Sequence, residues 1–199
     1  MSFIKKYNTW IFITIVAVLT IADIIFWNSL SLTRKIITVF AVLAALHEIE
    51  EKVWPGGFYD LMLKKFRMTP DEVDLGRGTL VVSIYWLLLL GSAYIFDSRL
   101  YLLAAIIVLA FFEAVIHTAG IRIHHLKKPY TPGLLTAWCL AIAGGFAVHS
   151  LNKAGSISRG DYALGFVVWL VSFACMDIVI ISGFGKPIPE LIKTVTGKK

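Results

Sequence analysis

Cysteine and charged residues are both scarce in this chain of 199 residues. Its two cysteines, Cys139 and Cys175, lie far apart in apolar stretches without CxxC spacing, which argues against a disulfide and against a cysteine zinc site. Charged residues make up only 16% of the chain, against about 25% in a typical soluble domain. Hydrophobic residues make up 58%, more than a soluble core of this size requires. The composition therefore predicts an integral membrane protein.

Six stretches are long and apolar enough to cross a bilayer as helices, since a span needs roughly 20 apolar residues. They cover residues about 8–30, 34–54, 79–96, 100–124, 134–151 and 161–184. The sequence contains no internal repeat, and no segment between the spans is large enough for a second domain, so we expect one transmembrane domain over residues 1–199. The expected fold is all-α, a polytopic bundle of six transmembrane helices.

The basic residues predict how this bundle is oriented. Six spans place both termini on one side of the membrane, and fourteen of the nineteen Lys and Arg residues lie on that side. The other five lie on the opposite side, and they are Arg34, Lys35, Arg99, Lys153 and Arg159. By the positive-inside rule we expect both termini in the cytoplasm, in a bacterial or archaeal cell membrane. This orientation explains the net charge of +6, so we expect membrane lipids as partners and no nucleic acid.

The longest connection, residues 55–78, lies on the expected cytoplasmic side. Apolar residues recur in it at helical spacing between basic ones, and they are Phe58, Tyr59, Met62, Leu63 and Phe66. This pattern indicates a short interfacial helix at the lipid headgroups. The stretch Thr69-Pro70-Asp71-Glu72 is typical of a capping box that starts a further helix. An ordinary solvated loop is the alternative for the connection.

Ionisable residues gather near the cytoplasmic end of the second span. An ionisable side chain inside a span is costly unless it is paired, metal-bound or hydrated, so each one is a functional candidate. At 100° per residue, Glu50 and Glu51 lie within about 60° of His47 around the helix axis. These three side chains therefore share one helix face. Glu48 lies at the edge of that face.

A second stripe of the same composition lies on the fourth span. His117 and His124 fall within about 40° of Glu113 around the helix axis, and His125 is turned away from them. Two spans thus present His and Glu residues at a similar depth on the same side of the membrane. An interfacial face paired with nearby Lys and Arg is one alternative interpretation, and a proton or ion relay without catalysis is another.

Three imidazoles and three carboxylates suit a borderline divalent cation such as iron, zinc or manganese. We expect one or two ions, with a dinuclear site preferred and iron or zinc as the metal, because a cation neutralises carboxylates that are otherwise costly in lipid. The expected ligands lie on the second and fourth spans, and they are His47, Glu50, Glu51, Glu113, His117 and His124. With two ions a Glu would bridge them, and with one ion Glu50 or Glu51 would act as a general base.

Two motifs carry a resemblance to a known family. The stretch His47-Glu48-Ile49-Glu50-Glu51 is followed by Pro55-Gly56-Gly57-Phe58, and Tyr130-Thr131-Pro132-Gly133 precedes Leu134-Leu135-Thr136-Ala137. With these motifs the chain resembles the HXXEE-motif family of small integral membrane proteins, over roughly residues 35–185. The family carries a further invariant histidine, which by placement would be His117 or His124. The resemblance implies that His47, Glu50 and Glu51 form a site in a protein suspected of being an enzyme, and it implies neither substrate nor metal.

From the residues we expect a metal-dependent membrane enzyme that acts on a lipid or another hydrophobic molecule, by oxidation with iron or by hydrolysis with zinc. Glu50 and Glu51 are expected catalytic residues together with Tyr130, whose hydroxyl we expect at a site beside His124. An interfacial tyrosine is the alternative for Tyr130. Asp177 is a candidate hydrogen-bond partner for a ligand histidine. A metal-ion or proton-coupled transporter and a non-catalytic membrane scaffold are the alternative functions.

Overall fold

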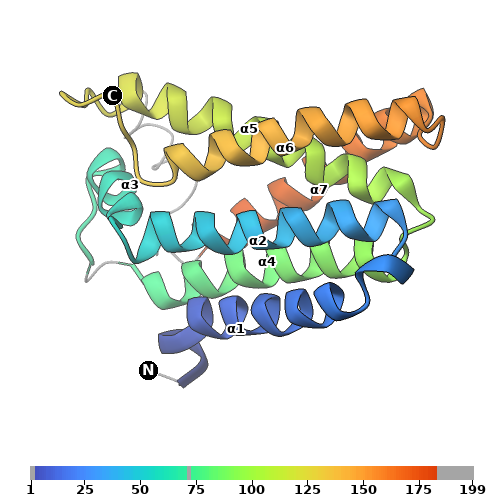
Figure 1. Cartoon of the computed structure of the whole chain (residues 1–199). Helices are drawn as coiled ribbons and strands as arrows, with labels where there is room; N and C mark the ends of the chain where they lie inside the picture. The colour runs from blue at the N-terminus through green and yellow to red at the C-terminus, as the bar shows by residue number, and fades with distance from the viewer. Residues whose placement is uncertain (1–2, 71–72, 183–199) are drawn as a thin grey trace.

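The chain folds into helices only, over the part that the computed structural model describes, residues 3–70 and 73–182. These residues form seven α-helices and one short 3-10 helix and contain no strand. The elements are α1 (Phe3–Ile25), η1 (Trp27–Ser29), α2 (Leu32–Lys52), α3 (Phe58–Phe66), α4 (Leu75–Ile95), α5 (Leu100–Ile123), α6 (Leu134–Lys153) and α7 (Arg159–Ile181). The expected all-α architecture is confirmed (Figure 1).

Three helices begin at a polar residue that caps their first turn. The side chains of Ser31 and Asp74 each accept a hydrogen bond from the backbone at the start of α2 and α4. Ser158 begins α7 in a full capping box. The capping box expected at residues 69–72 includes Asp71 and Glu72, which lie outside the described residues. The helix after that stretch is α4, and its N-cap is Asp74.

The first helix begins and ends earlier than its apolar stretch predicts. The expected span was about residues 8–30, whereas α1 begins at Phe3 and ends at Ile25. Lysine is a good helix former, so Lys5 and Lys6 continue the helix toward the N-terminus. At the other end the 3-10 helix η1 interrupts the α-helix before α2 begins.

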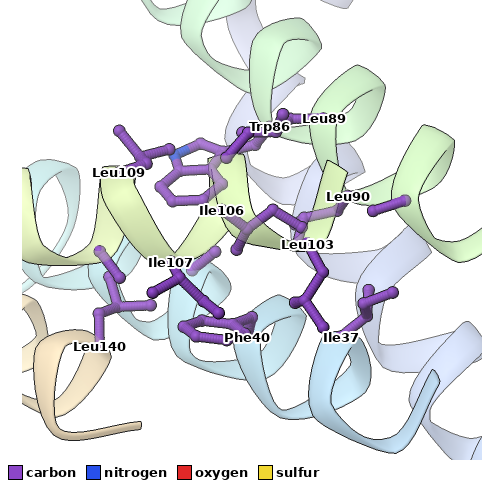
Figure 2. Close-up of a cluster of buried hydrophobic side chains, with 14 of the residues drawn as sticks. Ile37, Phe40, Trp86, Leu89, Leu90, Leu103, Ile106, Ile107, Leu109 and Leu140 are labelled. Atoms are coloured by element: carbon purple, nitrogen blue, oxygen red, sulfur yellow. The ribbon is translucent and has the colours of Figure 1, made fainter. Parts of the chain in front are cut away.

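An apolar core fills the middle of the bundle between α2, α4, α5 and α6. The central helix α5 contacts all three of these helices and α7 as well. Figure 2 shows the core side chains that meet there, and they are Ile37, Phe40, Trp86, Leu89, Leu90, Leu103, Ile106, Ile107, Leu109 and Leu140. The core thus separates the two ends of the bundle.

Among the described residues, five helices are long and apolar enough to cross a membrane, namely α1, α4, α5, α6 and α7. Five of the six expected spans are therefore helices that could cross a membrane. The remaining long helix, α2, has 21 residues and is not among the five, because charged residues occupy both of its ends. Large apolar side chains such as Ile21 on α1 and Leu170 on α7 are exposed on the outside of the bundle. These features describe an integral membrane protein.

Several helix ends meet at one end of the bundle, which we call the site end (Figure 1). α2 ends there, α3 follows it, and α4 and α6 begin there. Lys5 of α1 pairs with Asp74 at the start of α4. At the same end Ile181 of α7 and Leu75 of α4 pack against a small apolar cluster that contains Leu63 of α3. The expected short helix after the second span is present as α3, and its position at the lipid headgroups stays a prediction.

Candidate metal centre

Two helices bring four ionisable side chains together at the site end. His47 and Glu51 lie one turn apart on α2, and Glu113 and His117 lie one turn apart on α5. Nε2 of His117 lies 3.1 Å from Oε1 of Glu51 and 3.6 Å from Oε2 of Glu113. Nε2 of His47 lies 3.6 Å from Oε1 of Glu51 and 3.8 Å from Oε2 of Glu113. Each imidazole therefore faces both carboxylates, and we call these four residues the His/Glu cluster.

Three residues of the His/Glu cluster are withdrawn from solvent, and the side chain of Glu113 is 16% exposed. His47 and His117 are each only 2% exposed, and Glu51 is buried as well. The two imidazole rings meet edge to face, with their centroids 5.0 Å apart. The ring of Phe58, from α3, lies 5.4 Å from that of His117. Ionisable groups in such a place need charged or hydrogen-bonding partners, because burial makes an uncompensated charge costly.

The orientation of His47 is fixed by Thr136, in the first turn of α6. Nδ1 of His47 lies 3.0 Å from the hydroxyl oxygen of Thr136. The same hydroxyl donates to Oε2 of Glu50 at 2.5 Å. Because a hydroxyl has one proton to donate, Thr136 accepts from His47, which therefore carries a proton on Nδ1. In the neutral imidazole this leaves the lone pair of Nε2 directed into the His/Glu cluster.

His117 has the same arrangement with Thr131. Nδ1 of His117 lies 3.3 Å from the hydroxyl oxygen of Thr131, and this hydroxyl donates to the backbone carbonyl of His117 at 3.0 Å. The proton of His117 is therefore also on Nδ1. Its Nε2 is buried and makes no hydrogen bond with any residue that the structure describes, because the contact with Glu51 lacks hydrogen-bond geometry. Both imidazoles thus direct Nε2 at the two carboxylates.

Gly133 lets the backbone before α6 pass directly over the His/Glu cluster. Its φ of +93° lies in the left-handed region that favours glycine. A Cβ atom at this position would lie 2.5 Å from Cε1 of His117, 2.8 Å from Cγ of Glu51 and 2.9 Å from Cε1 of His47. Such distances are shorter than van der Waals contact, so only glycine fits here. The segment before α6 closes one side of the cluster.

Glu50 points toward the start of α6 and not toward the two histidines. Its carboxylate accepts from the backbone N–H groups of Leu135 at 3.1 Å and Thr136 at 2.8 Å. It also accepts from the hydroxyls of Thr136 at 2.5 Å and Tyr130 at 2.7 Å. These four donors occupy the lone pairs of the carboxylate, and the positive end of the α6 dipole favours its charge. Glu50 therefore holds the start of α6 against α2.

Tyr130 and His124 also lie apart from the place expected for them. The hydroxyl of Tyr130 donates to Glu50, and burial together with this carboxylate raises the pKa of Tyr130. His124 is the C-cap residue of α5. Burial, and then the nearby ammonium group of Lys65 on α3, lower the pKa of His124. The structure thus brings together four of the six expected ligands and gives Glu50 and His124 other neighbours.

Three further candidates lie around the cluster without joining it. Glu48 is fully buried and forms an ion pair with Lys52, one turn further along α2. His125 follows the end of α5 in a left-handed conformation, with a φ of +50°. Asp177 lies on α7. The outer nitrogens of the ligand histidines bond to threonine hydroxyls, which take the place expected for Asp177.

Three residues of the His/Glu cluster lie close enough together to hold a metal ion. Ligand atoms of His47, Glu113 and His117 all lie within 4.8 Å of one another. Ligand atoms held about 2.0–2.1 Å from a tetrahedral zinc ion lie about 3.3 Å apart. The four nitrogen-to-oxygen distances of the cluster, from 3.1 to 3.8 Å, bracket this value. Imidazole nitrogen and carboxylate oxygen are also ligands that zinc, iron and manganese accept.

The residues that orient the cluster had no assigned role in the sequence. Thr131, Gly133 and Thr136 were part of a motif, but helix periodicity does not show which helix they contact. The available signal was a small and hydroxyl-rich stretch immediately before and within the first turn of a span. A threonine beside the start of a helix and a glycine next to proline are more often turn and capping residues.

The whole cluster lies within a segment that a known family shares. A family model described as "Protein of unknown function with HXXEE motif" matches residues 38–148. The match confirms the resemblance drawn from the two motifs. No curated protein and no solved structure matches the chain.

Proposed function

Since the chain belongs to the HXXEE-motif family, whose function is unknown, we propose its function from its own residues. The chain is an integral membrane metalloenzyme that acts on a lipid or a similarly hydrophobic molecule. It binds one divalent transition-metal ion, zinc or iron, through four ligands: His47, Glu51, Glu113 and His117.

The direction of the two imidazoles carries this proposal. Thr136 and Thr131 hold a proton on Nδ1 of His47 and His117, so in the neutral imidazoles two Nε2 lone pairs converge with two carboxylates. Lone pairs and negative oxygens repel one another in a buried place unless a cation lies between them. Metal-bound histidines normally donate their outer N–H to an oxygen acceptor such as a carboxylate, a backbone carbonyl or water, and here a threonine hydroxyl is that acceptor.

One ion accounts for the geometry better than two. A second ion would need further ligands, and Glu50 and His124 were the residues expected to supply them. The Glu50 carboxylate already accepts four hydrogen bonds from the start of α6 and from Tyr130. His124 lies at the end of α5, near Lys65. Four ligands around one ion complete a tetrahedral shell, or leave positions for substrate in a larger shell.

We also propose that α2 is a sixth transmembrane helix and that the site end faces the cytoplasm. α2 lies alongside α1, α4 and α6 and is as long as α4. Its C-terminal end, which carries His47 and Glu51, is the end where Lys5 and Lys6 lie, and the fourteen-to-five distribution of Lys and Arg favours that end as cytoplasmic. The metal then lies near the inner membrane surface, within reach of lipid and of water.

The two neighbouring glutamates of the motif have different roles. Glu51 lies against both histidines and is one of the proposed ligands. Glu50 positions Thr136 and thereby His47. A bound zinc ion would supply an acidified water for hydrolysis, and a bound iron ion would supply redox chemistry. Tyr130 acts on Glu50 rather than on substrate.

Transport is the weaker alternative for the same cluster. A transporter needs polar groups along a path to the opposite membrane face. Beyond the His/Glu cluster the middle of the bundle is filled by large apolar side chains, among them Phe40, Ile106 and Leu140 (Figure 2). At the far end Asp23 is bound by the hydroxyls of Thr38 and Tyr94. These contacts favour a site that works from one face.

The decisive experiment is elemental analysis of the purified protein. We expect about one zinc, iron or manganese ion per chain, in keeping with a four-ligand site. His47→Ala and Glu113→Gln should abolish this binding. His149→Ala is the matched control, because His149 is exposed near the far end of α6 and should leave the metal content unchanged. Wild-type protein that takes up no transition metal, or cluster variants that keep it, would contradict the proposal.

A further inference from the structure

A polar hollow of about 380 Å³ lies beside the His/Glu cluster. It is formed by the starts of α1 and α4, the end of α2 and the first turn of α3. Glu51 lines this hollow and also faces both histidines. A molecule held in the hollow therefore touches one of the proposed metal ligands.

The hollow changes from charged to apolar along α1. Lys5 and Lys6 line it near the beginning of the helix, and Trp10 lines it about one turn further on. Trp10 is 52% exposed on the outside of the bundle, where lipid is expected. A lining that is cationic at one end and open to lipid at the other suits an amphiphilic molecule.

The charges of the lining favour an anionic group at Lys6. Lys5 pairs with Asp74, and Lys52 pairs with Glu48, so the charge of both ammonium groups is already balanced. Lys6 has no ion pair with any of the described residues, and its ammonium lies 5.2 Å from the centre of the Tyr7 ring. Two carboxylates also line the hollow. Glu51 faces the histidines, and Asp60 belongs to α3.

Hydrogen-bond donors accompany this cation. The N-cap residue of α3 is Gly57, so no side chain caps the backbone N–H groups in the first turn of this helix. Gly57 lines the hollow. Thr9 and Tyr59 line it as well. At about 30 Å³ per water-sized group, the hollow holds about a dozen such groups, enough for the roughly ten non-hydrogen atoms of glycerol phosphate.

We infer that this hollow binds the phosphate-bearing headgroup of a membrane glycerolipid, with the phosphate on Lys6 and the acyl chains leaving past Trp10. The headgroup end of the lipid then lies against Glu51. Reaction at that end rests on the proposed metal function, whereas binding of the headgroup does not require the metal.

The test measures lipid binding to the purified full-length protein in a neutral detergent. Dioctanoyl phosphatidylglycerol is the probe, and dioctanoylglycerol, which lacks the phosphate, is its matched control. We expect the phosphate-bearing lipid to bind preferentially, and Lys6→Gln to weaken it about tenfold, as for loss of one charge-assisted hydrogen bond. Thr9→Trp should block binding by filling the hollow. Lys153→Gln, at the end of α6, should have no effect.

The outcomes separate this inference from the metal proposal. Equal binding of the two lipids, or equal binding by Lys6→Gln and Lys153→Gln, would overturn the headgroup site whatever the metal content. Displacement of the lipid by inorganic phosphate at the same concentration would show a phosphate site and overturn the lipid site. Selective lipid binding by wild-type protein that takes up no metal would support the hollow while contradicting the metalloenzyme. Metal content should be unchanged in Lys6→Gln.

Discussion

Replacing Gly133 by alanine should disturb the His/Glu cluster more than any other change of one methyl group. The new Cβ would lie 2.5 Å from Cε1 of His117 and within 3 Å of Glu51 and His47. Crowding of this kind in a well-packed interior costs about 1–3 kcal/mol. The left-handed backbone at φ +93° adds about 1–2 kcal/mol for a residue with a Cβ.

The two costs together come to about 2–5 kcal/mol. The strain is relieved most directly by moving the imidazoles apart, so we expect it to act on metal binding. At about 1.4 kcal/mol per tenfold change, the lower limit corresponds to a loss of about 30-fold in metal affinity. Competition with a chelator of known affinity measures this loss, and unfolding in detergent measures the effect on stability.

Gly145→Ala is the matched control for this prediction. Gly145 lies on the same α6 helix, and a Cβ there meets nothing within 4 Å. Its replacement should leave metal affinity unchanged and stabilise the helix by up to about 1 kcal/mol. If Gly133→Ala bound the metal as tightly as wild type and unfolded at the same denaturant concentration, the close approach of α6 to the histidines would be refuted.

Three other substitutions test neighbouring contacts. Glu50→Gln places an amide against the N–H groups of α6, so the free energy of unfolding should fall by about 1–3 kcal/mol and metal affinity should fall with it. Lys52→Met leaves Glu48 buried without its cation, which should cost about 3–5 kcal/mol in denaturant unfolding and be relieved by a second change, Glu48→Leu. The pKa of Tyr130 is raised in the fold. The hydrogen bond from its hydroxyl to Glu50 therefore contributes fully to the free energy of unfolding below about pH 10, and this contribution is lost as pH rises further. Wild-type stability should therefore fall more steeply there than that of Tyr130→Phe, and parallel curves would contradict this assignment.

Hydropathy and helix geometry were sufficient for much of the fold and for half of the site. Long apolar stretches cannot be accommodated except as helices in lipid, which is why the helices α4 to α7 lie close to their expected ranges. Residues four apart on a helix share a face. The pairs His47 with Glu51, and Glu113 with His117, therefore follow from the sequence once both helices are expected.

The rest of the site depends on which helix packs against which. Glu50 and Glu51 lie next to each other in the sequence, and periodicity places both beside His47. The position of α6 separates their roles, because its first turn meets Glu50 and leaves Glu51 facing the histidines. The left-handed turn at Gly133 that brings α6 so close is a tertiary feature. The sequence patterns of α2 and α5 therefore do not predict this turn.

The division of the ligands between α2 and α5 also determines when the site can form. α2 packs against α6 as well as against α1 and α4, α5 packs mainly against α6 and α7, and α2 and α5 each hold two of the ligands. In the chain α2 precedes α5 by the whole of α3 and α4, so the two ligand pairs are synthesised at different times. Capture of an ion therefore has to wait for α5 and ties the two helices together. Metal content would then report how much of the protein has assembled correctly in a cell.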